Sequence, residues 1–240
     1  MLNTTPAAVH KISTSRQLVI VTTASWTGVK ARLCCFERSD AGWTRQMRPV
    51  NAVVGKKGLA WEEGLPGVPG EGPVKREGDG KAPAGVFPLL YAMGHAAKPP
   101  DNVTFRYEQI QPDLHCVDDA GSAYYNRIVH KGGLGTGAGE PWRSSEQLYQ
   151  MGEQYRWLIV VDYNKQDPKP GAGSCIFIHL WRSPEEGTAG CTAMAEPDLL
   201  ALLGWLREEK NPLLVQMPGA EYEQVGKIWG LPSLEQLEAP

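Results

Sequence analysis

The chain has 240 residues, of which 42% are hydrophobic and 21% charged, and its formal net charge is -3. This length and composition indicate a globular chain with a substantial core, and one elaborated domain is expected. Lysine and arginine are scattered and form no stripe, so we expect no nucleic-acid partner. No apolar run approaches the ~18 residues that a membrane span requires, so we expect no membrane span.

The cysteines are odd in number, and none lies in a C-x-x-C pair. The five are Cys34, Cys35, Cys116, Cys175 and Cys191. This spacing argues against a zinc or dithiol redox site, so no metal site is expected. If one thiol serves chemistry, four remain that either pair or stay reduced.

Runs of β-branched and apolar residues predict the strands. The first run, "QLVIVTT" at 17–23, is bounded by polar residues, and later runs repeat its character at 29–36, 46–54, 156–164, 174–182 and 212–217. Between Gly55 and Gly85, many glycines and prolines interrupt any regular period and predict a long surface loop.

Helical signals are fewer. Ser144 or Ser145 is suited to cap a short helix that ends at Gly152, and Pro197 is suited to begin a second. Four leucines of the second helix lie at the spacing of one buried stripe: Leu199, Leu202, Leu203 and Leu206. We therefore predict a mainly β domain with a few α-helices over 16–217, an N-terminal tail over 1–15 and a C-terminal extension over 218–240.

The stretch "IHLWRSPEEGTAGCTAM" sets His179 twelve residues before Cys191, among very small neighbours. In an extended strand, side chains alternate between two faces. One face would carry Cys175, Phe177, His179 and Trp181, and the other would carry Ile176, Ile178, Leu180 and Arg182. Small residues let backbone N–H groups approach a bound carbonyl, and a catalytic thiol needs a neighbouring base. The structural alternative is a buried thiol and a core histidine.

This stretch resembles the active-site signature of the L,D-transpeptidase (YkuD-like) catalytic domain family: a histidine, a variable loop, then Ser or Thr, any residue, Gly and Cys. Thr188, Gly190 and Cys191 fill the last three places. "GDGKAPAGVFPL" is similar to the family's Thr-Pro-x-Gly-x-Phe segment, with Ala82 replacing the threonine. "HCVDDAGSAYYNRIV" and "SSEQLYQMGEQYRWLIVVDYN" resemble the bacterial branch whose loop reads TAGC. Together these segments cover roughly 17–217.

The resemblance implies a β-sandwich-like catalytic fold that acts on peptidoglycan stem peptides without a cofactor. Cys191 attacks the carbonyl before a terminal D-alanine, His179 takes and returns the proton, and the Gly190 and Cys191 N–H groups form the oxyanion hole. In the family a backbone carbonyl orients the histidine. The acyl group then passes to an amine; the alternatives are an L,D-carboxypeptidase, in which water replaces the amine, and a non-catalytic peptide-binding domain.

Substrate contacts are expected from Thr188, Trp181, Arg182, Tyr125 and Asn126. The family often has glycine after the histidine and arginine two places after the cysteine, where this chain has Leu180 and Ala193. Candidate substitutes for that arginine are Arg182, Arg127 and Lys131.

The implied substrate predicts export to the periplasm, with residues 1–15 as a remnant that follows a signal peptide. The beginning lacks a signal profile itself, so a cytoplasmic protein is the alternative. An exported protein allows a Cys116–Cys175 disulfide, although the sequence alone favours two separate reduced core thiols. The oligomeric state is left open.

Overall fold

The computed structural model describes residues 7–64, 72–134 and 141–238, and it is mainly β, as predicted. Its strands are β1 (Gln17–Thr23), β2 (Lys30–Ser39), β3 (Gly42–Arg45), β4 (Val50–Val53), β5 (Leu59–Trp61), β6 (Ala82–Gly94), β7 (Tyr107–Gln109), β8 (Leu114–Val117), β9 (Ile128–His130), β10 (Ser145–Gln147), β11 (Trp157–Val161), β12 (Phe177–Leu180), β13 (Thr192–Met194) and β14 (Leu213–Pro218). The α-helices are α1 (Ala7–Thr14), α2 (Glu196–Trp205), α3 (Gly219–Trp229) and α4 (Leu234–Glu238), and the 3-10 helices are η1 (Lys131–Gly133), η2 (Leu148–Tyr155) and η3 (Glu208–Lys210).

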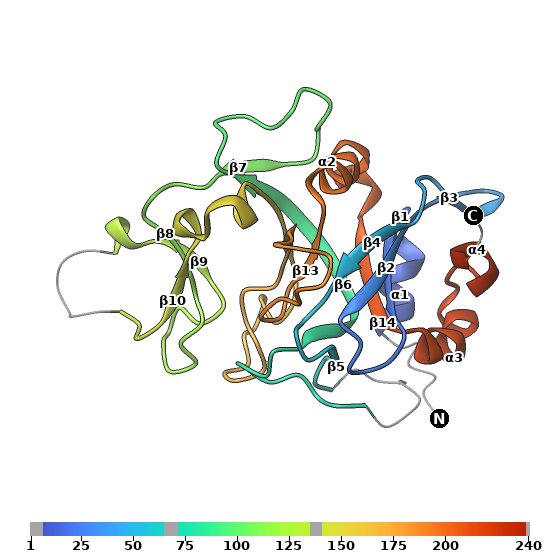
Figure 1. The fold of residues 1–240 in the computed structure, drawn as a ribbon, viewed down its shortest axis with the longest axis horizontal. Helices are drawn as coiled ribbons and strands as arrows, with labels where there is room; N and C mark the ends of the chain where they lie inside the picture. Colours follow the sequence, from blue (N-terminus) through green and yellow to red (C-terminus); the bar gives the residue numbers. More distant parts are fainter. Residues whose placement is uncertain (1–6, 65–71, 135–140, 239–240) are drawn as a thin grey trace.

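The large sheet closes on itself. Its strands follow the order β1-β14-β6-β11-β12-β13-β4-β2, and β2 pairs again with β1, so the two layers of the predicted sandwich are one continuous sheet. β3 extends the sheet from β2, while β5 and β7 pair with β6. In Figure 1 this barrel lies beside a separate group of strands, β8, β9 and β10.

These three strands form a small sheet in the order β10-β8-β9. A disulfide joins Cys116 of β8 to Cys175, which lies just before β12, with their Cα atoms 5.9 Å apart. The sequence-based preference for two reduced thiols is therefore wrong. The two cysteines are 59 residues apart in sequence, and they meet because the small sheet packs against the barrel wall.

The site strand β12 has a different core on each face. Ile176, Ile178 and Leu180 belong to the core inside the barrel. Cys175 and Phe177 face the other way and pack with small-sheet residues in a second core. The predicted alternation is confirmed for 176–180, where both faces are apolar because each one packs against a core. It does not extend over the whole of 174–182, because the strand spans only Phe177–Leu180 and Cys175 has a φ of 54°.

The helix predictions meet different outcomes. α2 begins near Pro197 as predicted, and its leucine stripe is buried. The predicted helix over 144–152 is wrong: Ser145–Gln147 pairs with β8 as a strand, and only the 3-10 helix η2 follows. Gly152 interrupts η2 with a φ of 60°. Pairing with β8 overrides the local helical signal.

The predicted loop between Gly55 and Gly85 contains β5 and the beginning of β6, and its residues 65–71 lie outside the described residues. The predicted N-terminal tail contains α1, whose Ala8 and Ile12 are buried against α3 and β6. The domain boundaries themselves remain a prediction. In the described ranges, no helix combines the length and hydropathy needed to cross a bilayer.

Candidate active site

His179 lies in the middle of the barrel wall. In β12 it stands opposite Leu158 of β11 on one side and Ala193 of β13 on the other, with 8% of its surface exposed. Its Nδ1 lies 2.8 Å from the Leu180 carbonyl oxygen. Because a carbonyl only accepts, this contact places the proton on Nδ1 and leaves Nε2 as the basic nitrogen. Burial lowers the pKa of His179 to about 4.

Cys191 lies directly before β13, at the edge of the second core. Its Sγ accepts from the Phe177 N–H at 3.3 Å and donates to the Cys175 carbonyl at 3.4 Å. Burial raises the pKa of this thiol, and the negative charge of Glu146 raises it further. The two hydrogen bonds fix the position of the sulfur; the one donated to the Cys175 carbonyl favours the neutral thiol, whereas the one accepted from Phe177 favours the thiolate and lowers the pKa against the effect of burial.

His179 and Cys191 line one cavity of about 260 Å³. Neither hydrogen bond of the thiol goes to His179. The opposite pKa shifts keep both groups neutral near pH 7, so the resting site holds a thiol and an imidazole and not an ion pair. In this structure the S–H points to the Cys175 carbonyl and not to Nε2.

Thr188 holds the loop that precedes Cys191. Its Oγ1 donates to the Cys191 carbonyl at 2.6 Å and accepts from the Gly190 N–H at 3.1 Å. Its backbone N–H donates to the Val54 carbonyl at 2.9 Å, and its carbonyl accepts from the Lys56 N–H at 2.8 Å. The loop is thereby fixed to the end of β4. The Gly190 N–H, a predicted oxyanion donor, is engaged by Thr188 in this structure.

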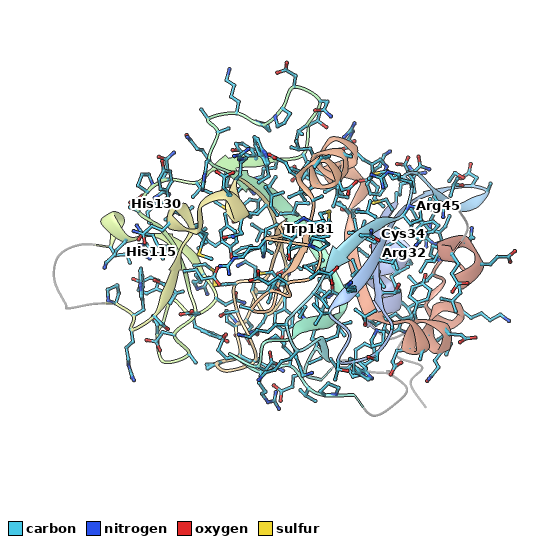
Figure 2. The ribbon with its side chains drawn as sticks, viewed as in Figure 1. Arg32, Cys34, Arg45, His115, His130 and Trp181 are labelled. Carbon is cyan, nitrogen blue, oxygen red and sulfur yellow. A yellow bond between two sulfur atoms is a disulfide. The ribbon has the colours of Figure 1, made fainter. Side chains whose placement is uncertain are left out.

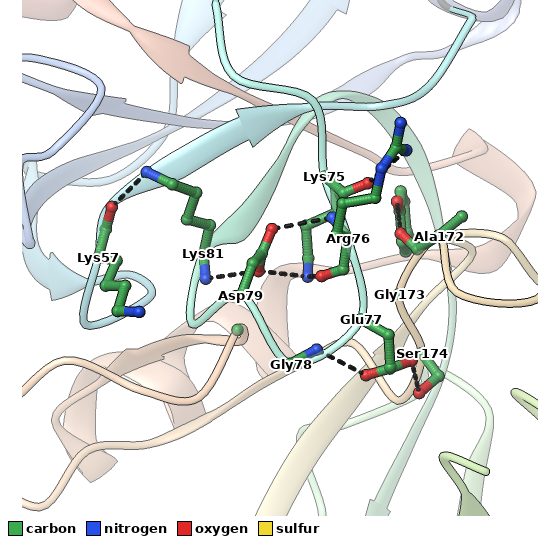
Figure 3. Close-up of polar contacts among 12 residues, drawn as sticks. Lys57, Lys75, Arg76, Glu77, Gly78, Asp79, Lys81, Ala172, Gly173 and Ser174 are labelled. Atoms are coloured by element: carbon green, nitrogen blue, oxygen red, sulfur yellow. Dashed lines mark hydrogen bonds and ion pairs between the residues drawn. The ribbon is translucent and has the colours of Figure 1, made fainter. Parts of the chain in front are cut away.

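Two glycines allow the loop to pack closely. A Cβ at Gly187 would lie 2.6 Å from the Lys56 Cα, and one at Gly190 would lie 3.1 Å from the Lys81 carbonyl oxygen. Lys81 ends a turn over 75–81 that is organised by Asp79 (Figure 3). The Asp79 carboxylate accepts from the Lys75 ammonium at 2.7 Å and from the Lys81 N–H at 2.9 Å. This turn forms the support behind the cysteine loop.

The YkuD family profile, described as the L,D-transpeptidase catalytic domain, matches residues 38–217. The chain belongs to the YkuD family. This match begins near the end of β2 and covers the barrel strands from β3 onward except the last residue of β14, together with the small sheet, His179 and Cys191.

Two solved structures are similar in shape to the chain. The helical cell shape determining protein Pgp2 from Campylobacter jejuni is 14% identical in sequence, with a TM-score of 0.41. The aligned region covers 88% of this chain and 54% of the Pgp2 chain. A point mutant of that protein is 13% identical with a TM-score of 0.39, covering 93% and 59%. The chain thus spans little more than half the length of these structures. No curated protein matches it.

Trp181 and Arg182 line the YkuD cavity, as does Lys56. Figure 2 places Trp181 between the small sheet, marked by His115 and His130, and the end of the barrel that carries Cys34. Arg182 is exposed and forms an ion pair with Glu186 at 3.0 Å.

The family's arginine position is filled by Ala193, which is fully buried beside His179. In this chain the cationic side chains that line the cavity are those of Lys56 and Arg182. Of the other two candidate substitutes, neither Arg127 nor Lys131 is among the residues that line it.

The structure does not bring Tyr125 and Asn126 to the cavity. Asn126 is buried with a φ of 57°, and its Oδ1 accepts from the Cys175 N–H at 3.0 Å. The Tyr125 hydroxyl accepts from the Gly173 N–H at 3.0 Å and donates to the Glu77 carboxylate at 2.5 Å. Glu77 also accepts from Ser174 (Figure 3). These side chains hold the segment that leads into β12.

Sequence reasoning missed Glu146 and Tyr155, which line the same cavity. The Tyr155 hydroxyl donates to Glu146 Oε2 at 2.7 Å, and its ring centroid lies 5.2 Å from that of His179. Glu146 lies in the segment predicted as a short helix and Tyr155 lies just after it, so no spacing signal pointed to either residue. In the described ranges, no cluster of three or more His, Cys, Asp or Glu side chains is placed to hold a metal ion.

Proposed function

We propose that this YkuD-family chain is a peptidoglycan L,D-transpeptidase that uses Cys191 as nucleophile and His179 as base. The observation that carries the proposal is that the two side chains line one cavity while a backbone carbonyl fixes the imidazole tautomer that leaves Nε2 basic. A domain that only binds peptides requires neither feature. Family membership supports the substrate class.

The reaction begins when a stem tetrapeptide occupies the cavity. The Cys191 proton passes to His179 Nε2 as the sulfur attacks the carbonyl that precedes the terminal D-alanine. The tetrahedral oxyanion forms beside the small-residue loop, where the Cys191 N–H and the Gly190 N–H are the proposed donors. The Gly190 N–H becomes available when its bond to Thr188 weakens.

Collapse of this intermediate breaks the bond to D-alanine, which takes the proton from His179 and leaves. The result is a thioester between the peptide and Cys191. An incoming amine then attacks the thioester, loses its proton to His179 and releases the thiol. Water in place of the amine gives a tripeptide, which is the carboxypeptidase outcome.

The other predicted contacts contribute in different ways. Trp181 offers an aromatic wall, and Arg182 and Lys56 offer cations for a peptide carboxylate. Thr188 contributes indirectly, by holding the loop that precedes Cys191. Tyr125 and Asn126 act on the segment before β12 and are positioning residues in this scheme.

We also propose that the protein is exported and acts in the periplasm. The family's cell-wall substrate lies outside the cytoplasm, and the Cys116–Cys175 disulfide is suited to an oxidising compartment.

Product analysis tests the proposal. Purified protein incubated with disaccharide-tetrapeptide should release D-alanine and give a cross-linked dimer, or an exchanged peptide when a D-amino acid is added. Cys191→Ala should give none of these products. If tripeptide is the only product even with abundant acceptor, the transpeptidase assignment is refuted and the carboxypeptidase assignment remains.

A further inference from the structure

Glu146 is a carboxylate inside the cavity that the proposed chemistry does not use. It lies in β10, opposite Cys116 of β8. One carboxylate oxygen accepts from the Tyr155 hydroxyl at 2.7 Å, and the side chain lines the cavity together with His179 and Cys191. Its second oxygen has no hydrogen-bond partner in the described part of the chain and faces the cavity.

The position of Glu146 relative to the thiol is fixed through the fold. Its strand partner Cys116 is bonded to Cys175, and the Cys175 carbonyl accepts the Cys191 S–H. On the other side, Tyr155 contacts both the carboxylate and the His179 ring. The fold therefore fixes this carboxylate in the cavity that the nucleophile and its base also line.

Lys56 and Arg182 line the same cavity, but neither forms an ion pair with this carboxylate. No lysine, arginine or histidine of the described residues forms an ion pair with Glu146, and Arg182 of the same cavity is paired with Glu186. Burial, with further contributions from Asp118 and Glu77, raises the pKa of Glu146 to about 7. A bound cation stabilises the charged form of such a half-buried carboxylate, because it replaces part of the lost interaction with water.

We propose that Glu146 is a specificity-determining residue that binds an ammonium group of the peptide substrate beside Cys191. This inference deepens the proposed function and rests on it for the identity of the substrate. The ammonium belongs either to the side chain of a diamino residue in the acyl donor or to the amine that accepts the acyl group. Both sources present the same group to the open oxygen of Glu146.

Binding can be measured without turnover in a Cys191→Ala background. The probes are a disaccharide-tetrapeptide with a free side-chain amine and the same peptide acetylated on that amine. Calorimetry at pH 8 should show tighter binding of the free amine by about ten- to a hundredfold, the range of a hydrogen bond to a charged group. Adding Glu146→Gln should reduce this preference to about one- to twofold.

The matched control is Glu153→Gln, which makes the same change at an exposed carboxylate outside this cavity. It should leave the preference unchanged. A preference that survives Glu146→Gln, or that is absent in the Cys191→Ala parent, overturns the proposal. Because this readout needs no chemistry, it separates a failure of Glu146 recognition from a failure of the transpeptidase assignment.

Turnover then distinguishes the two sources of the ammonium. With an acetylated donor and a free D-amino acid acceptor, a role in acceptor binding predicts that Glu146→Gln lowers the ratio of exchange product to tripeptide. A role in donor binding predicts slower acylation of Cys191 by the free-amine donor only. If Glu146→Gln lowered turnover equally with every donor and acceptor, both binding roles would be contradicted and a structural role would be indicated.

Discussion

Reduction of the Cys116–Cys175 disulfide should lower the free energy of unfolding. The cross-link closes a loop with a sequence separation of 59 residues. The chain-entropy relation gives about 14 cal/mol/K for a loop of this size, or about 4 kcal/mol at 25 °C. For a chain of this length, that loss corresponds to a melting temperature lower by about 8–16 °C.

The assay is urea unfolding of the oxidised and the reduced protein, followed by circular dichroism. Reduction retains both side chains, so the difference isolates the cross-link from any cavity. The Cys116→Ala/Cys175→Ala variant is the control and should not respond to reductant, because Cys34, Cys35 and Cys191 are free thiols. An unchanged midpoint in wild-type protein whose disulfide is reduced, as shown by mass, would refute the reasoning.

Further outcomes are expected at the site itself. Cys191→Ala should abolish thioester formation, measured by intact mass, with little change in circular dichroism, whereas Cys34→Ala should keep it; loss in both would indicate a folding effect. Thr188→Val should lower turnover and destabilise the fold by about 1–3 kcal/mol, because two hydrogen bonds of the loop lose their hydroxyl, and Thr188→Ser should restore both. Glu146→Gln should stabilise the protein by up to about 3 kcal/mol at pH 8 and by nothing at pH 4.5 in denaturant titrations. The pKa of Glu146 is raised from about 4.5 in the unfolded chain to about 7 in the folded protein, so the wild type loses stability as the pH rises from 4.5 to 7. A stability gain in Glu146→Gln that does not depend on pH would contradict this reasoning.

The barrel strands were predictable where both faces of a strand are buried. Within the run at 174–182, residues 176–180 gave a clear alternation because Ile176 and Ile178 pack inside the barrel while Phe177 packs outside it. The small sheet was not predictable, since its strands have only three or four residues and are held by pairing with each other. Ser145–Gln147 illustrates this: its local sequence favours a helix, but pairing with β8 makes it a strand.

The residues of the candidate site also differ in how far the sequence predicted them. His179 and Cys191 were predicted from the resemblance of one stretch of chain to a family signature, and a strand and a tight loop bring them to one cavity. Asn126 was predicted near the substrate but holds the Cys175 backbone, and its φ of 57° reflects this structural role. Glu146 reaches the thiol only through the strand pairing and the disulfide of Cys116. Such proximity has no signature in a single sequence.

The central claim is that Cys191 carries the acyl group, and acid-quenched mass spectrometry of the protein during turnover tests it most directly. With disaccharide-tetrapeptide, the mass of the protein should increase by that of the acyl tripeptide, and peptide mapping should locate the adduct on Cys191. The adduct should disappear in Cys191→Ala and decline sharply in His179→Ala. Release of D-alanine by the Cys191→Ala variant at the wild-type rate, or an adduct on another residue, would contradict the account.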